Sequence, residues 1–224
     1  MRRAYPLRPL YAGAILEIDT PHGPARIHPD EEVWRAPAVL VLGHGAGGGV
    51  GAPDLLAAAR AARSLGAAVV FVEQPYRVAG RRSPAPARQL DAAWLAVIGA
   101  LRQRTGPAAL IVGGRSSGAR VACRTAADAG AAAVLCLAFP LHPPGRADDP
   151  AKSRLPELDA AGMPVLVVQG ERDPFGMPPP GPGRTVVAVA ADHSLRRAEP
   201  VRAAVSEWLA PLVQAFREGG SAGS

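Results

Sequence analysis

Six short apolar runs recur along this chain with amphipathic segments between them, and this alternation constrains the fold more than any other feature. The runs cover residues 38–43, 68–72, 108–113, 133–138, 164–169 and 185–190. Each run is almost entirely apolar, which is typical of strands buried on both faces of a parallel sheet. The sequence therefore predicts an α/β fold in which helices cover both faces of a mostly parallel sheet.

The remaining segments complete this layout. Apolar and charged residues alternate at helical spacing over residues 54–64, 89–104, 117–129 and 199–217, which predicts the covering helices. Segments 14–19 and 25–28 flank a turn-like stretch and predict an antiparallel hairpin at the sheet edge. Residues 76–88 and 142–162 carry several prolines and are expected to be loops with short helical turns at most. We expect one domain over residues 1–217 and a disordered, Gly-rich tail over 218–224.

Charge and cysteine usage exclude several function classes. The net charge is +6, but all except one of the 25 basic residues are Arg scattered along the chain, so a nucleic-acid partner is not expected. Cys123 and Cys136 lack the spacing of metal ligands, and no metal is expected. No apolar stretch approaches the ~20 residues of a membrane span, and no secretory leader is apparent. We therefore expect a cytoplasmic protein without a membrane partner.

A G-x-S-x-G motif runs from Gly114 to Gly118, between a predicted strand and a predicted helix. Chance would supply roughly 0.1 such matches in a chain of this composition, so the strand before it and the helix after it matter more than the letters. In this context Ser116 is predicted to be a nucleophile held in a strained turn. The alternative is a tight strand-to-helix connection with a capping serine.

Two backbone N–H groups are candidates for an oxyanion hole. The N–H of Ser117 lies at the start of the predicted helix, where the dipole favours negative charge. The second candidate is the N–H of Ala46, in the glycine-rich loop that follows the first apolar run. Such a loop could instead bind a phosphate or a dinucleotide, but the acidic residue expected about 20 positions later is missing.

A serine nucleophile needs a histidine base and an acid that orients it, in the chain order Ser, Asp or Glu, His for this arrangement. Asp173 follows the fifth apolar run and His193 follows the sixth. Glu171 and Asp192 remain alternatives for the acid, and His142 remains an alternative for the base.

Other polar side chains also follow strand ends, where ligands bind in open parallel sheets. His44, Arg77 and His142 are therefore candidate substrate-binding residues. Arg77, with neighbouring arginines, could bind an acidic group of the substrate.

Several motifs in order resemble an α/β-hydrolase family that includes testis-expressed protein 30 and the hydrolase-like subunit of the NSL chromatin complex, and that is related to dienelactone hydrolases. The motifs are GHGAG at 43–47, YR at 76–77, GGRSSG at 113–118, FPLHPP at 139–144, QGERDPFG at 169–176 and DHS at 192–194. The resemblance spans about residues 38–208 and implies the α/β-hydrolase fold with a triad at Ser116, Asp173 and His193. One departure is Ser117, where relatives often carry Met.

The leading hypothesis is a serine hydrolase that cleaves an ester, thioester or similar acyl bond of a small-molecule substrate through an acyl-enzyme on Ser116. No cofactor is needed for this chemistry, and the short loops predict an open site without a large lid. A non-catalytic interaction module that retains the fold is the alternative, and a peptidase is a third reading. Nothing in the sequence indicates an oligomeric state.

Overall fold

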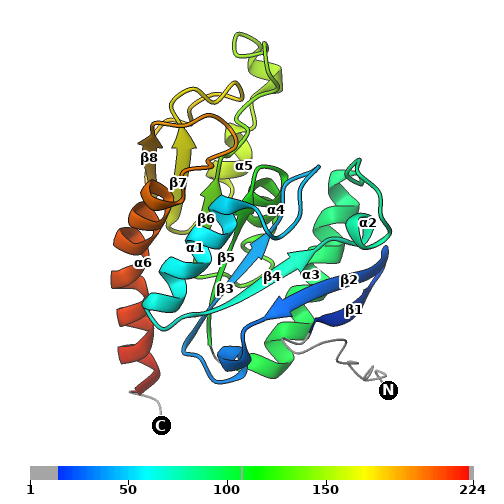
Figure 1. The fold of residues 1–224 in the computed structure, drawn as a ribbon, viewed down its shortest axis with the longest axis vertical. Coiled ribbons are helices and arrows are strands. Elements are labelled where there is room, and N and C mark those ends of the chain that lie inside the picture. The colour runs from blue at the N-terminus through cyan, green and yellow to red at the C-terminus, as the bar shows by residue number, and fades with distance from the viewer. Residues whose placement is uncertain (1–14, 107, 222–224) are drawn as a thin grey trace.

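The computed structural model describes residues 15–106 and 108–221, and an eight-stranded sheet forms its centre (Figure 1). The strand order is β1-β2-β4-β3-β5-β6-β7-β8. The strands are β1 (Leu16–Thr20), β2 (Gly23–Pro29), β3 (Ala38–Gly43), β4 (Ala68–Glu73), β5 (Ala109–Arg115), β6 (Ala133–Leu137), β7 (Val165–Gly170) and β8 (Arg184–Val189). All pairings among β3 to β8 are parallel, which confirms the predicted sheet.

The first two strands form the expected hairpin at the sheet edge. β1 pairs with β2 in antiparallel register, and β2 pairs with β4, also antiparallel. The hydroxyl of Thr20 donates to the carbonyl of Gly23 across the turn, at 2.6 Å. Ala14, the first residue expected in this hairpin, lies outside the described residues.

Helices cover both faces of the sheet. They are α1 (Pro53–Ser64), α2 (Pro75–Val78), α3 (Ala87–Thr105), α4 (Ser117–Thr125), α5 (Leu155–Asp159) and α6 (Ala198–Ser221), with short 3₁₀ helices at Glu31–Trp34 and Pro150–Lys152. Helices α1 and α6 pack in one apolar core, and α3 and α4 pack in the other, on the opposite face. Along β3 the side chains alternate between the two cores. Val39 and Val41 lie in the core with α3 and α4, and Leu40 and Leu42 lie in the core with α1 and α6.

Two helix ends differ from the sequence expectation. Helix α4 stops at Thr125 instead of residue 129, and turns lead to Gly130, whose φ is +61°. Helix α6 continues to Ser221, four residues beyond the end expected at residue 217, and the domain assignment over residues 1–217 stays a prediction. Once a helix is formed, an added Gly costs only about 1 kcal/mol. Gln214 also donates to Glu218 across one turn, at 3.0 Å. Residues 222–224 lie outside the described residues.

The parallel strands all end at one edge of the sheet, and their following loops carry the polar side chains discussed below. Within residues 15–106 and 108–221 these loops form no separate lid over that edge. The edge is therefore open, as expected from the loop lengths.

Candidate active site

Ser116 lies in the sharp turn that joins β5 to α4. Its backbone adopts φ 52° and ψ −111°, a conformation that is rare for any residue except glycine. The N–H of Ser116 donates to the carbonyl of Leu137 on the neighbouring strand, at 2.9 Å. The strained turn leaves Ser116 half-buried at the carboxyl edge of the sheet.

The turn requires small residues on both sides of the serine. A Cβ on Gly114 would lie 2.5 Å from the carbonyl oxygen of Gly43, and a Cβ on Gly118 would lie 2.5 Å from the same atom. Either methyl group would force α4 away from the ends of β3 and β5. The two glycines of the motif are thus explained by close backbone packing.

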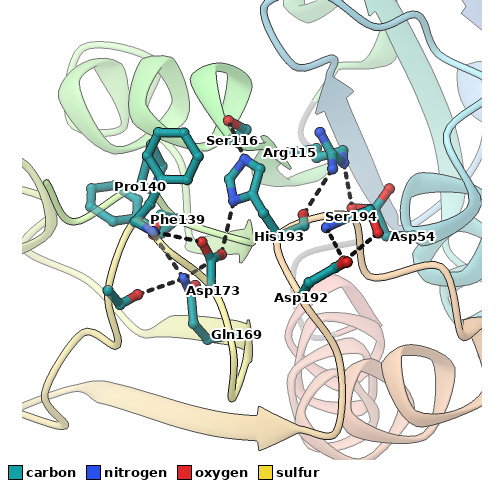
Figure 2. A network of polar contacts seen from close by, with 12 residues as sticks. Asp54, Arg115, Ser116, Phe139, Pro140, Gln169, Asp173, Asp192, His193 and Ser194 are labelled. Carbon is teal, nitrogen blue, oxygen red and sulfur yellow. Dashed lines mark hydrogen bonds and ion pairs between the residues drawn. The ribbon is translucent and has the colours of Figure 1, made fainter. Parts of the chain in front are cut away.

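Three side chains from three different loops form a hydrogen-bonded chain (Figure 2). The Nε2 atom of His193 lies 3.0 Å from the hydroxyl oxygen of Ser116. The Nδ1 atom of the same ring lies 2.8 Å from a carboxylate oxygen of Asp173. The carboxylate is buried completely, whereas the imidazole is about 20% exposed. A serine, a histidine and an aspartate therefore stand in the geometry of a catalytic triad.

Neutral donors hold the carboxylate of Asp173. The side-chain amide of Gln169 donates to one of its oxygens at 2.8 Å, and the N–H of Phe175 donates to the other at 2.9 Å. The same amide group contacts the carbonyls of Phe139 and Gly176. Gln169 was not predicted from the sequence, although an amide in an otherwise apolar strand, four residues before Asp173, is the signal that could have identified it.

The competing acids and base lie outside this chain of hydrogen bonds. Glu171 is exposed to solvent. Asp192 is also exposed, and it accepts a hydrogen bond from the N–H of Ser194 at 2.8 Å. The backbone N–H of His142 donates to the carbonyl of Phe175, so His142 lies against the loop of the acid.

The glycine-rich loop after β3 is fixed by two side chains. The Nε2 atom of His44 accepts from the N–H of Gln74 at 3.1 Å, so its Nδ1 must carry the proton that is donated to Gly45 at 2.8 Å. The hydroxyl of Tyr76 donates to the carbonyl of Ala46, at 2.8 Å.

His44 is buried, and burial lowers its pKa below the ordinary value. Both of its ring nitrogens are used within the protein. His44 therefore holds the loop, and a part for it in substrate binding stays a prediction.

Arg77 and Ser117 occupy the positions expected of them at the carboxyl edge. Arg77 lies on α2, directly beyond β4, and donates to the carbonyl of Arg81 at 3.2 Å. Ser117 is the first residue of α4 and borders a small cavity of about 10 Å³, which Trp94 and Val121 also line. This volume has room for about one water-sized group.

Arg115 connects the end of β5 with the loop that carries His193 (Figure 2). Its Nη2 donates to the main-chain carbonyl of His193 at 2.8 Å, and its Nε lies 2.9 Å from a carboxylate oxygen of Asp54. Burial raises the pKa of Asp54, and the charge of Arg115 opposes that effect. This pair was not predicted from the sequence, because Asp54 and Arg115 are far apart in the chain.

Over the described part of the chain, no group of three or more His, Cys, Asp or Glu side chains could hold a metal ion. In the same part, no helix is both long enough and apolar enough to cross a bilayer.

Comparison with known proteins places this geometry in context. Residues 36–206 match the family model described as an alpha/beta hydrolase domain. A search of curated proteins gives no match. Among solved structures, an α/β serine hydrolase without a lid from Xanthomonas campestris is similar with a TM-score of 0.72 and 24% identity, over 92% of this chain and 98% of that one.

Two further structures share the fold at lower identity. Est1E from Butyrivibrio proteoclasticus has a TM-score of 0.71 and 14% identity, over 89% of this chain and 99% of its own. A dienelactone hydrolase from Anabaena variabilis has a TM-score of 0.63 and 16% identity, over 87% of this chain and 95% of its own.

Proposed function

This chain belongs to the alpha/beta hydrolase domain family, and from that premise we propose that it is a serine hydrolase acting on an ester, thioester or related acyl bond of a small molecule. The observation that carries the proposal is the hydrogen-bonded chain from Ser116 through His193 to Asp173. A strained serine aimed at an oriented histidine is the arrangement that acyl transfer requires.

The reaction would proceed in two halves. The hydroxyl oxygen of Ser116 attacks the acyl carbon while Nε2 of His193 takes its proton, and Asp173 stabilises the resulting imidazolium. The imidazolium then gives this proton to the leaving alcohol or thiol, and an acyl-enzyme remains. A water molecule, deprotonated by His193, attacks the acyl-enzyme, releases the acid and restores Ser116.

The oxyanion of the tetrahedral intermediate would be bound by the backbone N–H groups of Ser117 and Ala46. The first-turn N–H groups of a helix have no intrahelical acceptor, and Ser117 begins α4. Its N–H also lies at the positive end of the helix dipole. The hydrogen bond from Tyr76 to Ala46 supports a fixed position for the second donor.

The surroundings of Ser117 support a short acyl group. The adjoining cavity of about 10 Å³ accepts a water-sized group but not a long chain. We therefore expect short-chain p-nitrophenyl esters to react faster than long-chain esters, with lactones and peptides as comparison substrates. The narrower relationship to testis-expressed protein 30 and the NSL subunit stays a prediction.

A fluorophosphonate probe tests the nucleophile directly. The folded protein should be labelled, and labelling should vanish in Ser116→Ala. Ser64→Ala, on α1, is the matched control and should be labelled like the wild type. A folded wild type that neither reacts with the probe nor turns over any ester of the panel would favour the alternative of a non-catalytic interaction module.

A further inference from the structure

We propose that Arg115 is a positioning residue of this site, which holds the His193 loop in line with Ser116 by tying it to the buried carboxylate of Asp54. The proposal rests on the proposed function for its catalytic consequence. It assigns a role to the variable residue that precedes the serine in the G-x-S-x-G motif.

The guanidinium group of Arg115 uses two different edges for two partners (Figure 2). Nη2 reaches the carbonyl of His193 at 2.8 Å, and Nε reaches Asp54 at 2.9 Å. Arg115 is bonded covalently to Ser116, so the loop of the base is tied to the neighbour of the nucleophile. A shift of His193 away from Ser116 would have to break this hydrogen bond.

The anchor at the other end is rigid. Asp54 is completely buried in the first turn of α1, and its second oxygen accepts from the N–H of Leu55 at 2.9 Å. Arg115 itself is only 18% exposed. A planar guanidinium held by a buried carboxylate has little freedom, whereas the single ammonium of a lysine cannot hold two partners in this fixed geometry.

The internal bonds of the His193 loop do not replace this anchor. The N–H of Ser194 donates to the side chain of Asp192, and the N–H of Leu195 donates to the carbonyl of Asp192 at 3.3 Å. These bonds shape the loop but do not fix it relative to β5. The hydrogen bond between Asp173 and the imidazole orients the ring, and Arg115 positions the main chain that carries the ring.

The test compares two kinds of variant that lose the hydrogen bond from Arg115 to His193. One kind leaves the buried charge of Asp54 in place, and the other removes it. Arg115→Met removes the guanidinium but leaves Asp54 uncompensated, and it can fail to fold for that reason alone. The double variant Arg115→Met with Asp54→Asn removes both charges and keeps an oxygen for the N–H of Leu55. Arg115→Lys is the conservative variant.

An ion pair at the opposite end of the same helix serves as the matched control. Arg63 contacts Asp30 through two hydrogen bonds, far from the triad in the chain. The double variant Arg63→Met with Asp30→Asn therefore removes an ion pair of the same residue types in a more exposed position, and it should keep the wild-type kcat.

For p-nitrophenyl acetate, the folded double variant of Arg115 and Asp54 should lose on the order of 10- to 100-fold in kcat, with KM changed by less than about 2-fold. Arg115→Lys should lose less kcat than the double variant but should not reach the wild-type kcat. A folded double variant with wild-type kcat, or a loss that lies wholly in KM, would overturn the proposal.

A crystal structure of the same double variant measures positioning without relying on activity. The distance between the Ser116 hydroxyl and Nε2 of His193 should increase, or the His193 loop should become disordered. An unchanged distance would overturn the inference even if the wild type proved inactive, whereas an inactive wild type alone would overturn only the proposed function.

Discussion

Two completely buried carboxylates flank the same histidine loop, and they are partnered in opposite ways. In the acid pocket, formed by Gln169, Asp173 and Phe175, every donor to the carboxylate apart from His193 is neutral. In the arginine clamp, formed by Asp54 and Arg115, the carboxylate faces a permanent cation. Asp173 contacts the imidazole of His193, whereas the arginine clamp contacts the main-chain carbonyl of His193.

The difference indicates which of the two carboxylates can take part in the proposed reaction. A cation beside Asp173 would compete with the imidazolium that forms when Ser116 loses its proton. Neutral donors satisfy the oxygens of Asp173 without cancelling its charge, so the charge remains available to His193. Asp54 has its charge compensated by Arg115, and what it supplies is a fixed position.

The largest expected effect comes from removing the charge in the acid pocket. Asp173→Asn should lower kcat about 10⁴-fold, because an amide favours the wrong tautomer of His193. Steady-state hydrolysis of p-nitrophenyl acetate measures this loss. Asp192→Asn is the control for the neighbouring exposed acid, and a comparable loss in that variant would show that the acid has been assigned incorrectly.

The arginine clamp should instead affect stability most. Arg115→Met leaves the buried carboxylate of Asp54 without a counter-ion, which should reduce the free energy of unfolding by about 3–5 kcal/mol. Urea denaturation measures the change. Adding Asp54→Asn should restore most of the stability, and a double variant as unstable as the single one would contradict this account of the pair.

A smaller effect is expected at Gln169, which supports the acid without touching the histidine. Gln169→Leu removes the donor to Asp173, and a hydrogen bond to a charged group contributes about 1.5–3 kcal/mol. We expect kcat to fall about 10-fold. A variant that retained full activity would mean that the N–H of Phe175 alone holds the carboxylate.

The smallest effect concerns a buried histidine outside both regions. Burial lowers the pKa of His44, whereas in the unfolded chain this group titrates near 6.5. As the pH falls below that value, the unfolded chain binds a proton that the folded chain resists, so stability is full above about pH 6.5 and declines below it. Urea denaturation at about pH 7.5 and about pH 5.5 should show a steeper decline for the wild type than for His44→Asn, by at most about 1.4 kcal/mol per pH unit. Equal declines in the two proteins would contradict the assignment.

The sequence predicted the features that depend on local pattern. Continuous apolar runs identified the strands from Ala38 to Val189, and parallel pairing then brings their carboxyl ends to one edge. Ser116, Asp173 and His193 each follow such an end, which is why their meeting could be expected before any distance was known. The helix end at Ser221 was missed, because glycine marks a stop only when the chain turns there.

Long-range partners could not be read from local pattern. In the sequence, Asp54 has the context of an ordinary acidic residue in the first turn of a helix, and Arg115 occupies a variable position of the G-x-S-x-G motif. Their pairing depends on how α1 packs beside β5, which no spacing in the chain encodes. The role of His44 in holding its loop was not predicted for a related reason, because its position after a strand end did not reveal that Gln74 and Gly45 would use both ring nitrogens.

The close packing around Gly114 and Gly118 affects what can be inferred when such a motif is retained during evolution. Both glycines are required by the carbonyl of Gly43, whatever chemistry the turn performs. Selection for folding alone would keep them in a descendant that had lost its serine and its activity. Within this motif, retention of the glycines would therefore indicate only a shared fold, whereas retention of Ser116 would indicate that the proposed reaction is retained.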